Sequence, residues 1–248
     1  LYKNQDDYEN GILLTDPFLL KHPDNRDVSR LSGYLHYLTR NYPMAVERFR
    51  RSADLQDTSA FVYKYLGYSY FKSNKYPEAI AVLEKVYMQD SSDAELCYVL
   101  GIAHDVPENI RYFNAAIRLA SPVVDYLSDV YQDLALALTK IVRYNEALAL
   151  LLKAHEITPQ DPNILYKIAV HFENWLDNKS LALKYYRDFL AARPENYDPK
   201  VLPSGPYPVD PSYYSSAERS IKALEEGIQA PPAVSDSTSH PVFPPAGL

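Results

Sequence analysis

The chain has 248 residues, of which 47% are hydrophobic and 23% charged, a composition that excludes a chain disordered throughout or largely embedded in a membrane. A formal net charge of −7 argues against binding along a nucleic-acid backbone, which needs a basic surface. Because Cys97 is the only cysteine, an intramolecular disulfide and a thiolate metal cluster are also excluded. The most unusual feature is the number of tyrosines, 23, which must find places in the structure.

The N-terminal segment, residues 1–25, precedes the first complete unit of a repeat that is described below. Pro23 lies one full repeat period before Asp57, which is near the end of the first complete unit, residues 26–59. Phe18–Leu20 fall where a preceding unit would have its second helix. We therefore expect this segment to be a partial N-terminal repeat or a cap. The opening Leu1–Lys3 has neither an initiator methionine nor the basic and apolar regions of a signal peptide, so the start looks trimmed.

Three glycines recur at a constant interval. Gly33, Gly67 and Gly101 are equally spaced along the sequence, and Ala45 and Ala79 follow the first two at the same distance. A period of about 34 residues with a small residue at a fixed place predicts a stacked array of helix-turn-helix units. A glycine inside a helix costs roughly 0.5–1 kcal/mol relative to alanine, so we expect each glycine to allow a close approach of the two helices of its unit, near the alanine.

The clearest unit covers residues 60–93 and predicts two amphipathic helices joined by the polar turn Ser73–Lys75. The side chains expected on the facing sides of these helices recur at helical spacing: Tyr63, Leu66, Gly67 and Tyr70 in the first, then Ala79, Leu83 and Val86 in the second. Pro43 and Pro77 stand where second helices would begin, a position at which the missing N–H of proline is harmless.

About five such units are predicted across residues 26–194. Their bounds are 26–59, 60–93, 94–124, 128–161 and 162–194. The third unit is expected to be shortened, because Phe113 arrives about one helical turn early; either one helical turn is missing or the loop near 105–108 is incomplete. The fifth unit carries a one-residue insertion around the turn 177–179. In the first unit Ser32 and His36 interrupt the apolar stripe of the first helix, which makes that helix the least regular of the array.

The fourth unit carries a near-complete set of the recurring residues: Tyr131, Leu134, Ala135, Leu138, Tyr144, Ala147, Leu151, Ala154 and Pro159. This pattern resembles the tetratricopeptide repeat (TPR) family, whose consensus is an aromatic residue, Leu-Gly, a second aromatic, then alanine, a large apolar residue, alanine and proline. The resemblance covers most of the chain. It implies an all-α fold, a right-handed α-solenoid of stacked helix-turn-helix repeats, in which the first helices line a concave groove.

The C-terminal part is rich in proline, with ten of the 19 prolines at or after Pro199. Residues 195–228 are expected to form a proline-rich strap followed by a helix, from Ser212 to Gly227, that caps the last repeat. Solenoids need such a cap because their terminal faces would otherwise be exposed. The tail, residues 229–248, has the composition of a disordered segment.

No catalytic or metal-binding motif is present in the sequence. The six histidines form no HExxH pair, and neither a GxSxG nor a phosphate-binding glycine loop occurs. His36 and His104 fall at core positions of the repeat, and Cys97 takes the place of a buried apolar residue. We therefore expect no enzyme activity, no cofactor and no metal.

Residues near each glycine would point into the groove that the resemblance implies, and in the first three units many are aromatic. The predicted partner-binding residues are Arg30, Tyr34, Tyr37, Lys64, Tyr65, Tyr68, Phe71 and Tyr98. Rigid rings with hydroxyls beside two cations would suit an extended peptide or a partner helix. The alternative is that these rings pack between neighbouring repeats. Family members that hold a C-terminal carboxylate carry asparagine where this chain has Tyr34 and Tyr68, so that mode of binding is not expected here.

Three functions follow from these patterns, in order of preference. The first is a non-catalytic scaffold that binds a protein or peptide in the aromatic groove. The second is a structural or self-associating module whose C-terminal strap occupies the groove, and the third is an enzyme. No run of about 18 apolar residues predicts a membrane span. The acidic, tyrosine-rich and cysteine-poor composition and the trimmed start resemble repeat proteins of the bacterial envelope, so the periplasm or envelope is expected before the cytoplasm. The oligomeric state is left open.

Overall fold

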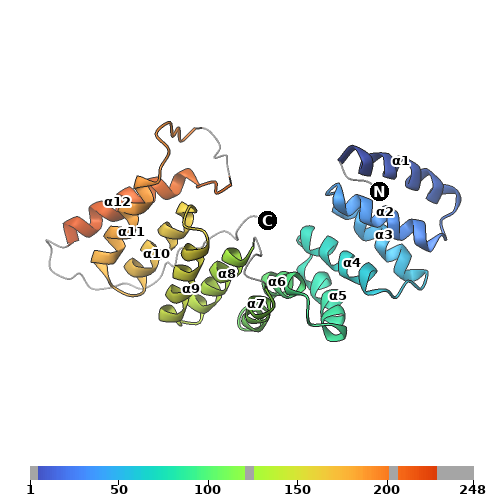
Figure 1. Ribbon diagram of the computed structural model, residues 1–248, viewed down its shortest axis with the longest axis horizontal. Helices are drawn as coiled ribbons and strands as arrows, with labels where there is room; N and C mark the ends of the chain where they lie inside the picture. Colours follow the sequence, from blue (N-terminus) through green and yellow to red (C-terminus); the bar gives the residue numbers. More distant parts are fainter. Residues whose placement is uncertain (1–4, 121–125, 201–205, 228–248) are drawn as a thin grey trace. The chain divides into compact units, whose positions relative to one another are not determined.

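The computed structural model describes residues 5–120, 126–200 and 206–227, and over these ranges all regular structure is α-helical (Figure 1). The expected all-α fold class is confirmed. The helices are α1 (Gln5–Lys21), α2 (Arg26–Leu38), α3 (Tyr42–Asp54), α4 (Ala60–Lys72), α5 (Tyr76–Gln89), α6 (Ala94–Ala103), α7 (Glu108–Leu119), α8 (Leu127–Lys140), α9 (Tyr144–Ile157), α10 (Pro162–Asn174), α11 (Lys179–Ala191) and α12 (Pro211–Gly227).

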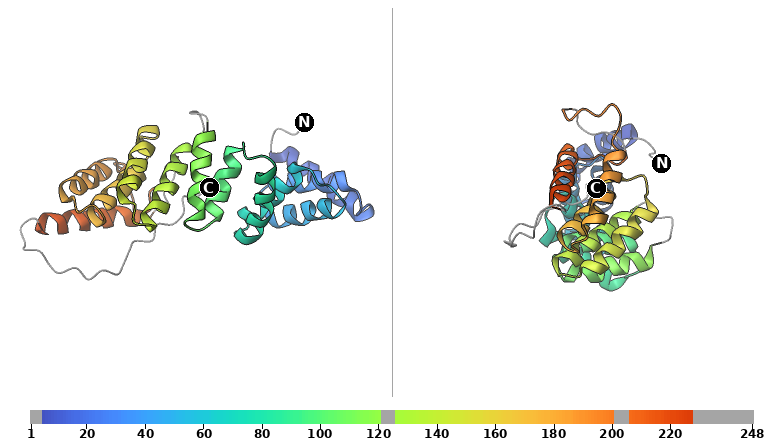
Figure 2. Two further views of the ribbon diagram at one scale, coloured as in Figure 1. Left: turned by 90° about the horizontal axis from the view of Figure 1, so that it is seen from below. Right: turned by 90° about the vertical axis from the view of Figure 1, so that its left-hand side faces the viewer.

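The chain divides into two compact units, Leu1–Ala120 and Ser121–Leu248. In unit 1, α2 pairs with α3, α4 with α5 and α6 with α7, each pair packs on the next, and α1 packs on α2 (Figures 1 and 2). In unit 2, α8 pairs with α9 and α10 with α11, and α12 packs on α11. Each unit is therefore a stack of helix-turn-helix repeats.

The glycines do bring the paired helices close together, but against a different neighbour from the one expected. A Cβ at Gly33 would lie 3.0 Å from the ring of Phe49, and a Cβ at Gly101 would lie 2.6 Å from the ring of Phe113. Ala45 and Ala79, the expected neighbours, are fully buried but are not the nearest groups. The large apolar residue one turn further along the second helix fills the space, because it projects across the gap between the two helix axes.

The turns between paired helices repeat the same backbone geometry. Arg40, Asn74 and Val142 adopt φ values of 60°, 58° and 65°, and they occupy the same place in their repeats. Such left-handed residues end helices by allowing the following N–H groups to reach back to free carbonyls. In the fifth repeat the left-handed residue is Asp177, one position later, and Asn178 N donates to Phe172 O at 2.9 Å. The expected one-residue insertion therefore lies in this turn.

The third repeat is short because its first helix lacks the last turn. Helix α6 has 10 residues, whereas α4 has 13. Phe113 packs against Gly101 as Leu83 packs against Gly67, but Phe113 follows its glycine about one helical turn sooner in the sequence. The missing residues are thus removed from the end of α6 and from the start of α7, whereas the turn between the two helices is not shortened.

Polar residues in the first helix of the first repeat have a partner on α1. Asp16 accepts a hydrogen bond from Ser32 Oγ at 2.8 Å, and its second carboxylate oxygen lies 3.1 Å from His36 Nε2. Ser32 and His36 are both buried. The interrupted apolar stripe of α2 is therefore the surface on which α1 docks, with the hydroxyl and the imidazole paired to a carboxylate as buried polar groups require.

Helix α12 covers the end of unit 2, in the place expected for a capping helix. Tyr214, Ala217 and Leu224 are buried, and the Tyr214 ring stacks on Phe189 of α11 at a centroid distance of 5.0 Å. Arg193 also pairs with Glu218 at 2.8 Å. The part of the strap at 201–205 and the tail expected to be disordered, residues 229–248, lie outside the described residues.

Candidate functional site

The eight predicted partner-binding residues all lie in unit 1, on the first helices of its three repeats. Helix α4 contacts both α2 and α6, so these helices form one continuous wall. The residues come from α2 (Arg30, Tyr34 and Tyr37), from α4 (Lys64, Tyr65, Tyr68 and Phe71) and from α6 (Tyr98).

Three of the eight residues are core residues. Tyr68, Phe71 and Tyr98 are only 3%, 7% and 2% exposed. Tyr68 and Phe71 pack in one core cluster with residues of α5 and of α6 in the next repeat, and the ring of Tyr98 lies 6.2 Å from that of Phe113 on α7. All three rings therefore offer a partner almost no surface, and Tyr68 and Phe71 take the packing between repeats that the sequence left open as the alternative. Tyr34, Tyr37 and Tyr65 are half-buried, with part of each ring facing solvent.

The half-buried rings meet at Tyr65. Its ring centroid lies 4.9 Å from Tyr34, 5.1 Å from Tyr37 and 4.7 Å from Phe61. Phe61 is 40% exposed and was not among the predicted residues, although its position one helical turn before Tyr65 places it on the same helical face. We call Tyr34, Tyr37, Phe61 and Tyr65 the aromatic face.

The two predicted cations are engaged within the protein. Arg30 Nη1 donates to Asp57 Oδ2 at 2.7 Å, and Lys64 Nζ donates to Asp93 Oδ2 at 2.5 Å. Asp93 caps α6 and Asp57 precedes the cap of α4, so each cation ties one first helix to the start of the next. Burial alone would raise the pKa of Asp57, but hydrogen bonds from Ser59 and the charge of Arg30 outweigh it and hold that pKa below its ordinary value.

Two hydroxyls of the aromatic face, those of Tyr37 and Tyr65, have a raised pKa. Burial, followed by the neighbouring Tyr34, raises the pKa of Tyr65 to about 12, and burial together with the charge of Glu95 raises the pKa of Tyr37. The wall therefore presents neutral hydroxyls and ring surfaces, while Arg30 and Lys64 are already paired with carboxylates. Such a surface suits apolar side chains and backbone carbonyls better than a free acidic group.

In unit 2 the equivalent wall carries different residues. Lys167 Nζ donates to Gln132 Oε1 at 2.6 Å, and the ring of Tyr166 is stacked against Tyr213 of α12 at 4.5 Å, with 9° between the ring planes. Asn163 Nδ2 also donates to Pro208 O at 3.3 Å. The C-terminal segment thus covers part of the first-helix wall of the fifth repeat.

Within residues 5–120, 126–200 and 206–227, no group of three or more His, Cys, Asp or Glu side chains is arranged to hold a metal ion. None of the helices in these ranges combines the length and the hydropathy that a membrane span needs. Cys97 is buried, and burial raises the pKa of its thiol to about 11, which disfavours the reactive thiolate.

Antiparallel helix pairs with a small residue at the contact, a period of about 34 residues and stacked first helices define the fold of each unit, which is a TPR-like stack of helix-turn-helix repeats. The family model described as "Anaphase-promoting complex, cyclosome, subunit 3" matches residues 4–86, about a third of the chain. No curated protein matches the sequence.

Several solved structures share the fold. The MamA protein is 20% identical with a TM-score of 0.61, over 67% of this chain and 91% of that one. YrrB, described as "a TPR protein with an unusual peptide-binding site", is 17% identical with a TM-score of 0.59, over 74% of this chain and 94% of that one. The C-terminal part of a TPR repeat-containing protein from Cytophaga hutchinsonii is 16% identical with a TM-score of 0.62, over 91% and 93%. At these identities the likeness concerns the fold.

Proposed function

We propose that this chain is a non-catalytic scaffold that binds a polypeptide through the aromatic face of unit 1. The observation that carries the proposal is the cluster around Tyr65, in which four rings from two consecutive first helices lie edge to face or tilted and keep part of their surface in contact with solvent. Clustered tyrosines are typical of binding surfaces, because each ring contributes a large contact area at a low cost in side-chain entropy.

The partner is expected to be an apolar or aromatic peptide segment. Leu31, which is exposed on α2, adds an aliphatic side chain to the same helix face as Tyr34. Because Arg30 and Lys64 are bound to Asp57 and Asp93, attraction of an acidic partner would require breaking pairs that hold the repeats together. The affinity is therefore expected to depend only weakly on salt concentration.

The second candidate, occupation of the wall by the C-terminal segment, is supported by one observation in unit 2. Tyr213 stacks on Tyr166, and Val209 is buried in the same segment. If the C-terminal segment mediates self-association, the variant Tyr213→Ala should change the mass measured by light scattering, because it removes the stack on Tyr166.

The scaffold proposal is tested by capturing partners from the native organism with the full chain and with the variant Tyr34→Ala/Phe61→Ala, followed by mass spectrometry and calorimetry with the captured peptide. We expect at least a tenfold loss of affinity in the variant. Tyr131→Ala, a half-buried tyrosine on α8 of unit 2, is the matched control. Equal affinity of a folded Tyr34→Ala/Phe61→Ala variant would overturn the proposal.

A further inference from the structure

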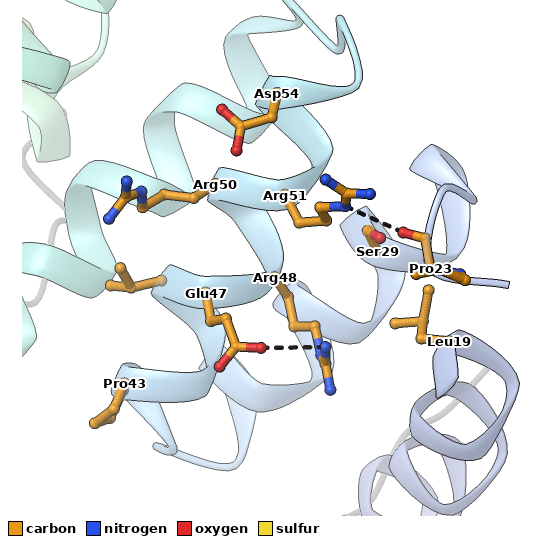
Figure 3. A pocket seen from close by; sticks show the side chains of 10 residues that line it. Leu19, Pro23, Ser29, Pro43, Glu47, Arg48, Arg50, Arg51 and Asp54 are labelled. Atoms are coloured by element: carbon orange, nitrogen blue, oxygen red, sulfur yellow. Dashed lines mark hydrogen bonds and ion pairs between the residues drawn. The ribbon is translucent and has the colours of Figure 1, made fainter. Parts of the chain in front are cut away.

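A pocket of about 490 Å³ lies in unit 1 between the C-terminal end of α1, the start of α2 and one side of α3 (Figure 3). It shares no lining residue with the aromatic face. Arg48 and Arg51 come from α3, Ser29 from α2, and Leu19 and Pro23 from the end of α1 and the turn after it. A volume of this order is typical of sites for small molecules or for single side chains of a partner.

Two buried donors in this pocket have no acceptor among the described residues. Ser29 is 1% exposed, and its Oγ makes no hydrogen bond there; the same holds for the buried Nε of Arg48. Buried polar groups are nearly always hydrogen-bonded, because leaving one unpaired costs free energy. Figure 3 shows Ser29 beside Arg51 and Pro23, with Arg48 about one turn away on α3. Both unsatisfied groups can donate a hydrogen bond, so what is missing is an acceptor.

The guanidinium groups keep donors to spare. Arg48 reaches Glu47 at 3.4 Å and Asp16 at 3.5 Å, both long for hydrogen bonds. Arg51 donates through Nε to Pro23 O at 3.2 Å and pairs with Asp24 through Nη2. A guanidinium has five N–H donors in a fixed fork, which suits carboxylate and phosphate groups.

The charge of the lining also favours an anion. Three arginines line the pocket, against two acids, Glu47 and Asp54. Glu47 has a side chain that is 63% exposed, so it can turn into solvent when another acceptor takes its place beside Arg48.

We infer that this pocket binds a small oxyanion, either the carboxylate or the phosphate group of a ligand, with Arg48, Arg51 and Ser29 as donors. Leu19 and Val46 line the same pocket and would contact an apolar part of that ligand. The pocket lies apart from the proposed peptide-binding surface in that none of its lining residues belongs to the aromatic face.

The test is a titration of the full chain with inorganic phosphate and, separately, with acetate, at constant ionic strength, followed by NMR or calorimetry. Wild-type protein should bind at least one of the two anions. Arg48→Gln should weaken that binding about tenfold and Ser29→Ala about threefold or more, as expected for the loss of a charge-assisted and a neutral hydrogen bond. Arg143→Gln makes the same charge change on an exposed arginine of unit 2 and serves as the matched control.

The outcomes separate the sources of the anion. Tighter binding of phosphate identifies a phosphoryl group, and equal or tighter binding of acetate identifies a carboxylate. Ser29→Ala should also leave the thermal midpoint of the free protein unchanged or raised, because the hydroxyl has no partner to lose, so this variant keeps the test valid if Arg48→Gln fails to fold. Absence of binding, or equal binding by Ser29→Ala and wild type, overturns the inference, as does equal weakening in Arg143→Gln.

Discussion

Gly67 of α4 lies directly against Leu83 of α5, so closely that a Cβ placed on the glycine would be 2.4 Å from both Cγ and Cδ2 of the leucine. Real Cβ atoms essentially never approach other carbons to this distance. Leu83 is fully buried, so its side chain has no free space into which it could withdraw. The contact explains why a helix in the middle of the array keeps a residue that weakens helices.

Gly67→Ala is therefore expected to destabilise the protein by about 1–3 kcal/mol, the usual cost of overpacking a core, although alanine is the better helix former. Urea unfolding followed by circular dichroism measures this change. Gly227→Ala is the matched control: the nearest atom to its added Cβ is Lys179 Nζ at 3.9 Å, so this variant should be neutral or slightly more stable. Equal stability of Gly67→Ala and wild type would contradict the close contact.

Val142 adopts a left-handed backbone conformation at a turn position where the other repeats carry residues that tolerate this conformation better. Its φ of 65° is unfavourable for a β-branched side chain, whereas Asn74 holds the equivalent place with φ 58°. Val142 is 68% exposed, so replacing it removes little buried surface. Val142→Asn should stabilise unit 2 by about 1 kcal/mol through relief of backbone strain.

The reverse substitution, Asn74→Val, should destabilise unit 1 by a similar amount. Thermal or urea unfolding of both variants measures the pair. The hydrogen bonds that close the two turns are alike, with Arg143 N to Leu138 O and Lys75 N to Tyr70 O both at 2.9 Å, so the comparison isolates the side chain. A loss of stability in Val142→Asn would show that backbone strain at Val142 does not limit the stability of unit 2.

Two tyrosines of unit 1, the half-buried Tyr65 and the buried Tyr112, predict a loss of stability at alkaline pH. Burial raises the pKa of Tyr65 and of Tyr112 from 10.0 to about 12. The folded state therefore holds these protons more tightly than the unfolded state, so their contribution is complete below pH 10 and is lost as the pH rises from 10 to about 12.

Within that window the free energy of unfolding should fall by up to about 1.4 kcal/mol per pH unit for each tyrosine. Urea unfolding at several pH values, together with the phenolate absorbance, measures it. Tyr65→Phe keeps the ring and removes the titrating group, so its stability should decline less steeply than that of wild type. Identical slopes for the two proteins would rule out this contribution.

The repeat itself was predictable because it rests on local chemistry. Helical spacing, proline in the first turn of second helices and a polar turn between the two helices are all visible within one unit of sequence. Even the insertion near Asp177 and the early arrival of Phe113 could be read from the register alone. The structure places the insertion in the turn and the shortening at the end of α6 and the start of α7.

Which aromatic side chains are exposed, and so able to contact a partner, could not be predicted in this way. Periodicity places Tyr65 and Tyr68 on the same side of α4, but Tyr68 is buried between first helices whereas part of Tyr65 reaches solvent. The difference depends on how neighbouring helices pack around each ring. Whether Arg30 and Lys64 are free to bind a partner likewise depends on Asp57 and Asp93, which lie 27 and 29 residues away in the sequence. No helical pattern connects these acids to the two cations.

By itself the amino-acid sequence determined the helix pairs, their period and the turns between them, because these follow from hydrophobic spacing and backbone preferences over a few residues. Only the tertiary structure decided which rings are core and which are surface, and that Arg30 and Lys64 tie consecutive repeats together. It also brought Ser29 Oγ and Arg48 Nε, neither of which has an acceptor among the described residues, to one pocket. These properties are set by contacts between helices that are distant in the chain, where packing distance and burial control the free energy.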